Sequence, residues 1–329
     1  MNRRESLIAL FSLGAASGLS PAWAQQQAKV WRLGYLRTSQ FTSSTVGLRE
    51  GFIDGMRKLG YVEGRDFVVE WRFADGDIKR FPELAASLVQ VKVDLIVSSG
   101  TPATMAASKA TSGIPIVLVN VADPVASGVA KSLARPGGNV TGVADLTGDL
   151  GPKNLEYLVG SIPGITRVAV LFDPAGAGSV IISKNIQAGA KQARVMVEAI
   201  AATTASQIDE AYLRMKEQKI GACIVAGGNL FTEHIRRIVE LSVKHRLPTA
   251  STNFPHVFSG ALLSYGADHA ETNRRVAYYV DRIFKGAKPA DLPIEQPTKF
   301  ELAFNLKTAK ALDLVIPPVV LAQANKVIE

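Results

Sequence analysis

The hydrophobic positions of this chain alternate between two patterns. Short runs rich in Val, Ile and Leu are followed by longer stretches in which apolar residues recur every three or four positions. The first pattern is typical of a strand covered on both faces, and the second of an amphipathic helix. In the stretch 46–59, for example, Phe52, Met56 and Leu59 share one face before Gly60 ends the predicted helix. The alternation therefore predicts a parallel α/β architecture.

The alternation runs through the chain twice, with a restart after Pro163. Five strands are predicted before this residue and four after it: 30–36, 66–71, 93–99, 114–121 and 140–146, then 167–173, 195–201, 222–226 and 248–252. We therefore expect two doubly wound parallel-sheet lobes with a cleft between them. The length of 329 residues also fits two domains better than one.

The carboxy-terminal segment adds elements after both lobes are complete. A strand is predicted over 261–265, a helix over 269–285 and another strand over 300–305, followed by a helical tail. Such a segment indicates that the chain crosses back and that several strands form a stiff hinge. We expect residues 25–143 with about 261–290 to form the N-terminal lobe, and about 144–260 with 291–329 to form the C-terminal lobe.

Residues 1–24 carry the pattern of an export signal. Arg3-Arg4 precede a mildly apolar stretch over 7–19, and Ala22-Trp23-Ala24 form a small-x-small cleavage sequence. The apolar stretch is shorter than the roughly 20 residues needed to span a bilayer. We expect cleavage after Ala24 and a periplasmic product. The arginine pair favours the twin-arginine route, but Ser6 stands where that motif usually carries Phe, so the general secretory route stays equally open.

Charge and residue counts exclude several functions. Apart from the first residues, the lysines and arginines behind the net charge of +8 come singly or in pairs among acidic residues, so no nucleic-acid partner is expected. A single cysteine, Cys223, excludes disulfide frameworks and zinc ribbons. The four histidines lack ligand spacing and are expected in solvent-facing or capping positions, and no metal site is predicted. Neither a phosphate-binding loop nor a nucleophile elbow occurs, so we predict no catalytic residue and no cofactor.

The most informative motif is Ser98-Ser99-Gly100-Thr101-Pro102-Ala103. A buried strand is predicted to end at Ser99, with Thr101 as the N-cap of the next helix and Pro102 at its first position. In parallel sheets ligands bind beyond the carboxyl ends of the strands, where a helix N-terminus offers free N–H groups to an anion. We therefore predict that the amides of Thr101 and Ala103, with the hydroxyl of Ser98 or Ser99, bind a ligand carboxylate. An ordinary capped turn is the alternative.

Other strand ends supply further candidate ligand residues. Asn120 and Asp123 follow the fourth predicted strand, and Asp123 either caps its own predicted helix or accepts a hydrogen bond from a ligand ammonium. Equivalent places in the second lobe hold Asp173, Asn229 and Asn253. Thr38, after the first predicted strand, completes the candidates of this kind.

Longer stretches of the chain resemble a known family. These are Gly100-Thr101-Pro102-Ala103, the run 123–143, and the carboxy-terminal stretches 263–266, 279–283, 285–293 and 295–302. They resemble the ABC-transporter substrate-binding proteins of the tryptophan-binding TrpX type. The resemblance implies the type I periplasmic-binding-protein fold, with three crossovers between two lobes that close on a ligand. It also implies uptake of an amino acid, often aromatic or branched, or a related carboxylate, and delivery to a membrane permease by a monomeric protein.

The resemblance implies roles for individual residues as well. Ser98, Ser99, Thr101 and Ala103 match positions at the ligand carboxylate, whereas Asn120, Asp123 and Tyr265 match positions elsewhere in the cleft. The sequence Asn253-Phe254-Pro255-His256 departs from the aromatic or basic residues usual before the carboxy-terminal strand, so the ligand does not follow from the family.

Two other functions stay open. A sensor would present the same closed form to a membrane receptor, and a neighbouring receptor kinase gene would favour it over transport. An exported enzyme would use the interlobe cleft and would turn over a bound metabolite, but the sequence shows no nucleophile–base pair.

Overall fold

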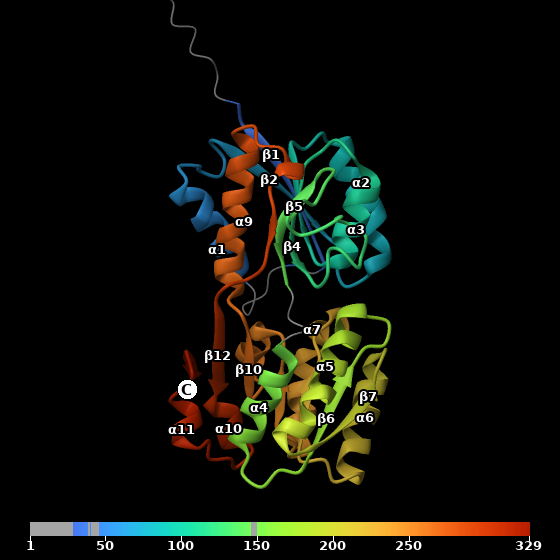
Figure 1. Cartoon of the computed structure of the whole chain (residues 1–329), viewed down its shortest axis with the longest axis vertical. Coiled ribbons are helices and arrows are strands. Elements are labelled where there is room, and N and C mark those ends of the chain that lie inside the picture. Colours follow the sequence, from blue (N-terminus) through green and yellow to red (C-terminus); the bar gives the residue numbers. More distant parts are fainter. Residues whose placement is uncertain (1–28, 39, 41–45, 146–149) are drawn as a thin grey trace, which may run out of the picture.

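The computed structural model describes residues 29–38, 40, 46–145 and 150–329. They form two α/β lobes, stacked along the long axis of the molecule (Figure 1). The predicted export signal, residues 1–24, lies outside the described residues.

The N-terminal lobe is built on a six-stranded parallel sheet with the strand order β11-β5-β4-β3-β1-β2. Its strands are β1 (Trp31–Arg37), β2 (Phe67–Phe73), β3 (Leu95–Ser99), β4 (Ile116–Val121), β5 (Val140–Ala144) and β11 (Ile294–Glu295). Four helices complete it: α1 (Val46–Lys58), α2 (Phe81–Gln90), α3 (Thr101–Ala110) and α9 (His269–Phe284).

Helices cover both faces of this sheet because successive residues of each strand are buried on opposite sides. On one side, Leu33 and Val97 pack with Phe52 of α1 and Val280 of α9. On the other, Leu36, Ile96 and Leu118 pack with side chains of α2 and α3. Each fully buried aliphatic side chain contributes roughly 1.5–3 kcal/mol to folding.

The C-terminal lobe has a seven-stranded sheet with the order β13-β12-β10-β9-β8-β6-β7, in which β12 runs antiparallel to β10. Its strands are β6 (Arg167–Phe172), β7 (Met196–Ala201), β8 (Ala222–Val225), β9 (Thr249–Ser251), β10 (Leu263–Ala267), β12 (Phe300–Asn305) and β13 (Lys326–Ile328). Its helices are α4 (Gly151–Ser161), α5 (Ala177–Ala193), α6 (Ala205–Glu217), α7 (Asn229–Glu233), α8 (Ile235–Lys244), α10 (Leu306–Ala311) and α11 (Pro318–Leu321).

Among the described elements, the chain passes from one lobe to the other three times (Figure 1). It crosses between β5 and α4, between β10 and α9, and between β11 and β12. The last two crossovers are joined, because the Asp268 N–H donates to the Lys299 carbonyl at 3.0 Å. The predicted hinge of several strands is present.

The nine strands predicted before residue 253 are confirmed within a few residues, but the predicted lobe boundaries need correction. The segment 261–267 was expected in the N-terminal lobe, whereas β10 pairs with β9 and β12 in the C-terminal sheet. Conversely, β11 at 294–295 pairs with β5 in the N-terminal lobe. The observed division is therefore 29–144 with 268–295, and 150–267 with 299–329. The tail also ends in a short strand, β13, beside its predicted helical part.

Candidate ligand-binding site

The carboxyl ends of the two sheets face each other, and two contacts between the lobes are seen at glycines of the described residues. Gly76, in the loop after β2, lies against the carboxylate of Glu233 at the end of α7. Ala122, after β4, meets the start of α5, where a Cβ atom added to Gly178 would lie 3.2 Å from the Cβ of Ala122. Because the sheet order is β4-β3-β1-β2, the ends of β3 and β1 lie between these contacts. We call the loops at these carboxyl ends, in both lobes, the interlobe face.

The start of α3 is the part of this face best suited to an anion. Gly100 is the N-cap, with φ 90° and ψ 158°, a conformation that favours glycine. Its N–H donates to the Val119 carbonyl, and the first helical bond runs from the Thr104 N–H to the Gly100 carbonyl. Thr101 and Ala103 thus carry N–H groups without an intrahelical acceptor, and Pro102 has no N–H at all. Among the described residues, these two backbone donors have no hydrogen-bond acceptor.

The structure changes the details of this motif. Thr101 is the first residue of α3 and not its N-cap, so Pro102 occupies the second helical position and not the first. Ser98 is fully buried, and its hydroxyl lies 2.8 Å from that of Thr104 inside the strand–helix junction. We therefore leave Ser98 out of the candidate site. Ser99, the last residue of β3, is half-buried and stays in it.

Asn120 and Asp123 differ in how many hydrogen bonds their side chains make within the protein. Asn120 has φ 57° at a register shift between β4 and β5, a bulge that turns the strand end. Within the part of the chain that the structure describes, its side chain makes no hydrogen bond. The Asp123 carboxylate accepts the N–H groups of Val125 and Ala126 at 3.0 and 2.9 Å. The capping role predicted for Asp123 is thus present, but the residues after it form turns and not the predicted helix.

The second lobe repeats the geometry of the first. Gly228, the N-cap of α7, has φ 111° and ψ 158°, close to the values of Gly100. Asn229 follows it as the exposed first residue of that helix. The Asp173 carboxylate, after β6, accepts the N–H of Ala175 at 2.9 Å, so this side chain is partly committed to its own turn.

Asn253 belongs to a hydrogen-bonded cluster that the sequence did not reveal. Its Nδ2 lies 3.1 Å from Nε2 of His256 and 3.2 Å from the hydroxyl of Thr232 in α7. Nδ1 of His256 lies 2.8 Å from the hydroxyl of Ser251, the last residue of β9. His256 is only 2% exposed, so the prediction that the histidines are solvent-facing or capping was wrong for this residue. Thr232 was missed because it is 21 residues away and a short helix brings it near.

Tyr265 and Thr38 lie apart from this cluster. The Tyr265 ring, on β10, packs against those of Tyr157 and Phe300, with centroid distances of 5.3 and 6.1 Å. Burial raises its pKa. The Thr38 carbonyl accepts the Gly76 N–H at 3.1 Å, which ties the end of β1 to the loop that touches Glu233.

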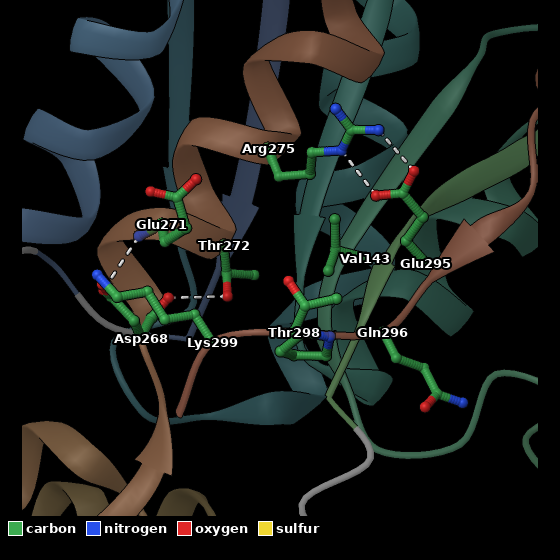
Figure 2. Close-up of a pocket in the computed structure, with 10 residues that line it drawn as sticks. Val143, Asp268, Glu271, Thr272, Arg275, Glu295, Gln296, Thr298 and Lys299 are labelled. Carbon is green, nitrogen blue, oxygen red and sulfur yellow. Dashed lines mark hydrogen bonds and ion pairs between the residues drawn. The ribbon is translucent and has the colours of Figure 1, made fainter. Parts of the chain in front are cut away.

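A pocket of about 450 Å³ lies at the hinge and not among the predicted residues (Figure 2). The start of α9 and the crossover from β11 to β12 line it. The guanidinium of Arg275 forms two hydrogen bonds with Glu295, at 2.7 and 2.6 Å, and Lys299 lies 3.3 Å from Asp268. Hydrogen bonding from Arg275 lowers the pKa of Glu295 although burial opposes it. The Arg275–Glu295 pair joins α9 to β11 within the N-terminal lobe, and the Asp268–Lys299 pair joins the second crossover to the third.

Burial and hydrogen-bond partners shift the pKa of Asp268 in opposite directions. Burial alone would raise the pKa of this carboxyl, but the Glu271 N–H and the Lys299 ammonium outweigh it, and the pKa lies below its ordinary value. Asp268 is also the N-cap of α9, with its Oδ1 accepting the Glu271 N–H at 3.1 Å. Both the N-cap of α9 and the ion pair with Lys299 therefore favour the ionised form of this carboxylate.

Two searches over the described residues bear on other classes of site. Within 29–38, 40, 46–145 and 150–329, no group of three or more His, Cys, Asp or Glu residues could hold a metal ion. Of the helices in that part of the chain, none is both long and apolar enough to cross a membrane.

Two doubly wound lobes, three crossovers and facing carboxyl ends define the type I periplasmic-binding-protein fold. The model of the family described as "ABC transporter substrate binding protein" matches residues 42–328. The chain belongs to this family, whose members capture solutes outside the cytoplasm and deliver them to a membrane permease. The resemblance noted in the sequence is confirmed.

Individual relatives agree with this assignment. A tyrosine-binding protein of Clostridioides difficile is 28% identical over 267 residues, which are 81% of this chain and 76% of the relative. An ABC domain from Streptococcus pneumoniae, solved in complex with L-Trp, is 25% identical with a TM-score of 0.83, over 91% of this chain and all of that one. A conserved domain protein from Vibrio cholerae gives the same identity, TM-score and shares of both chains.

Proposed function

We propose that this protein captures an aromatic amino acid between its lobes and delivers it to an ABC importer. The observation that carries the proposal is the start of α3, whose two unpaired backbone donors lie on the interlobe face between the two lobe contacts. A helix N-terminus with such donors is suited to a carboxylate. The tyrosine-binding and L-Trp-bound relatives support an aromatic side chain.

The proposed site draws on both lobes. Ser99, Thr101 and Ala103 bind the carboxylate, Asn120 lies beside it, and Asp173, Asn229 and Asn253 face it from the second lobe. A ligand that touches both lobes stabilises the closed form by its higher affinity for that form. Tyr265 and Thr38 act at the margins, through aromatic packing and through the loop that holds Gly76.

The cellular setting is part of the proposal. The protein is exported by the signal in residues 1–24, cleaved after Ala24, and works in the periplasm as a monomer that binds its solute without chemical conversion. Its closed form docks on the permease. The predicted signal supports export, and the family match supports the permease as partner.

The direct test is a binding titration with a backbone variant. Thr101→Pro removes one of the two N–H donors, and proline is well tolerated at a first helical position after a residue with ψ 158°. Thr101→Ala is the matched control, because it removes the hydroxyl and keeps the N–H. Calorimetry with L-tyrosine and L-tryptophan should show about tenfold or greater weakening for Thr101→Pro, since a hydrogen bond to a charged group is worth about 1.5–3 kcal/mol.

The amines tyramine and tryptamine, which lack the carboxylate, provide the second control. Their weaker binding should be the same for the original protein and the Thr101→Pro variant. If Thr101→Pro leaves amino-acid affinity unchanged, the start of α3 does not bind the carboxylate. If none of the amino acids binds the original protein, the proposed solute class is wrong.

A further inference from the structure

In the cluster around His256, the Asn253 amide is placed with Nδ2 toward Thr232 and His256. The Thr232 hydroxyl donates to the Gly228 carbonyl at 3.0 Å, so its oxygen accepts a hydrogen bond from Nδ2 of Asn253. The second hydrogen of Nδ2 points to Nε2 of His256, at 3.1 Å. Both donor hydrogens of the amide are therefore taken up by groups of its own lobe.

With the amide in this direction, the cluster fits the tautomer of His256 that is protonated on Nδ1. Nε2 also lies 3.2 Å from the Thr232 hydroxyl, whose oxygen is the acceptor that the other tautomer would use. Nε2 can accept from Asn253 only while it carries no proton, so in the neutral ring the proton is on Nδ1. Nδ1–H then donates to the Ser251 hydroxyl at 2.8 Å, whose oxygen also accepts the Asn253 N–H at 3.1 Å. The opposite tautomer would place an N–H against the Nδ2 group and would favour the flipped amide. The ring tautomer and the amide direction are thus coupled.

The remaining atom of the amide, Oδ1, has no hydrogen-bond partner among the described residues. Asn253 is half-buried at the carboxyl end of β9, two residues beyond the last strand residue, and its partner Thr232 precedes Glu233, which touches Gly76 of the first lobe. The amide therefore lies at the edge of the interlobe face. Its free atom is an acceptor and not a donor.

We infer that His256 is a positioning residue that holds Oδ1 of Asn253 toward the ligand, where it accepts a hydrogen bond from the ligand's ammonium group. The inference rests on the proposed function, since it names the second-lobe partner of an amino acid whose carboxylate is bound at α3. His256 does not touch the ligand. It selects for an amine-bearing ligand by preventing the amide from presenting its Nδ2 donor instead.

The test compares two ligands that differ only in the amine. L-tyrosine carries it, and 3-(4-hydroxyphenyl)propionate lacks it but keeps the carboxylate and the ring. His256→Leu removes both ring nitrogens, whereas His256→Gln keeps a side-chain acceptor. His245→Leu, the same change at a half-buried histidine at the end of α8, is the matched control. Melting temperatures are recorded for every variant.

For His256→Leu, we expect tyrosine to bind about tenfold more weakly, the effect of one lost hydrogen bond to a charged group, and the propionate to bind within about twofold of the original protein. His256→Gln should restore most of the tyrosine affinity, and His245→Leu should change neither ligand. In the Asn253→Ala background, His256→Leu should cause no further loss, because the residue through which it acts is gone.

Equal weakening of both ligands by His256→Leu would mean that the ring only supports the fold of the second lobe, which overturns the inference. Additive losses in the double variant, or unchanged tyrosine affinity in His256→Leu, would overturn it as well. Failure of the proposed function is a different result: the original protein would then bind neither tyrosine nor the propionate.

Discussion

The contact between Gly178 and Ala122 offers a steric test of lobe closure. Gly178 is the second residue of α5, in the C-terminal lobe, and Ala122 follows β4 in the other lobe. A Cβ atom on Gly178 would lie 3.2 Å from the Ala122 Cβ, a spacing at which the neighbour must yield by a few tenths of an ångström. Gly178→Leu adds three more carbon atoms, which the closed arrangement cannot hold without separating the lobes.

The magnitude follows from the cost of overpacking. Extra methylene groups in a packed contact cost about 1–3 kcal/mol. Here the cost falls only on the form in which the two lobes touch, which the proposed function takes as the closed form. A ligand that needs the closed form should therefore bind about 5- to 150-fold more weakly. Within its own lobe the substitution replaces a helical glycine, so propensity favours the variant by up to about 1 kcal/mol. The fold should be as stable as before or slightly more stable.

The assay is calorimetry with L-tyrosine and L-tryptophan, combined with thermal melting of the free protein. Gly160→Leu is the matched control, because Gly160 lies in α4, where the nearest atom is a Val320 methyl carbon at 3.5 Å in the same lobe. If Gly178→Leu melts normally and still binds within about twofold, the lobes do not meet at Ala122 in the ligand-bound form, and the reasoning from this contact is refuted.

Three further outcomes follow from single side chains. The pKa of Asp268 is lowered in the folded protein, so its contribution to stability is present above its unfolded pKa of about 3.9 and is lost as pH falls through its folded pKa. Lys299→Met should raise the folded pKa of Asp268. Acid unfolding, followed by circular dichroism, should then occur at higher pH. Burial raises the pKa of Cys223 to about 12, so a thiol reagent at pH 8 should label it only after unfolding, and rapid native labelling would contradict its burial. Asn154 donates to the Tyr265 carbonyl and accepts the Tyr265 N–H, at 2.8 and 3.1 Å, so Asn154→Ala should lower the free energy of unfolding in urea by about 2–3 kcal/mol, and a change below 0.5 kcal/mol would show that β10 does not depend on it.

Local pattern was enough to locate most strands, because a strand buried on both faces must be almost continuously apolar. It was not enough to assign β10 and β11 to a lobe. Membership of a sheet depends on which neighbour a strand pairs with, and β10 reads as the same kind of apolar segment in either sheet. The two-residue β11 is too short to show any periodic pattern of apolar residues. Only its pairing with Gly142 and Val143 reveals it as a strand.

The part of the candidate site at the start of α3 was predictable, because a single turn contains all of its residues. Gly100, Thr101 and Ala103 lie within four residues, so the free donors could be predicted from the sequence. The cap was predicted one residue too late, at Thr101 and not at Gly100. The hydroxyl of Ser98 was misassigned because alternation along a strand says that Ser98 and Ser99 face opposite ways, but not which of them faces the core. The cluster around His256 joins residues from β9, the turn after it and α7, which only the folded lobe brings together.

Each lobe has a helix that begins after a glycine N-cap of the same geometry, but the two helices differ in length and in their contacts. Gly100 and Gly228 share nearly the same backbone angles, yet α3 has 10 residues and α7 has only five. A helix of five residues adds little to the dipole at its start, and Thr232 in its first turns is bonded back to the Gly228 carbonyl and to Asn253. The first lobe is therefore the better anion site, while the second lobe presents side-chain acceptors. That division matches the two ends of an amino acid, so under the proposed function we expect discrimination between amine-bearing ligands and simple acids to come from the second lobe.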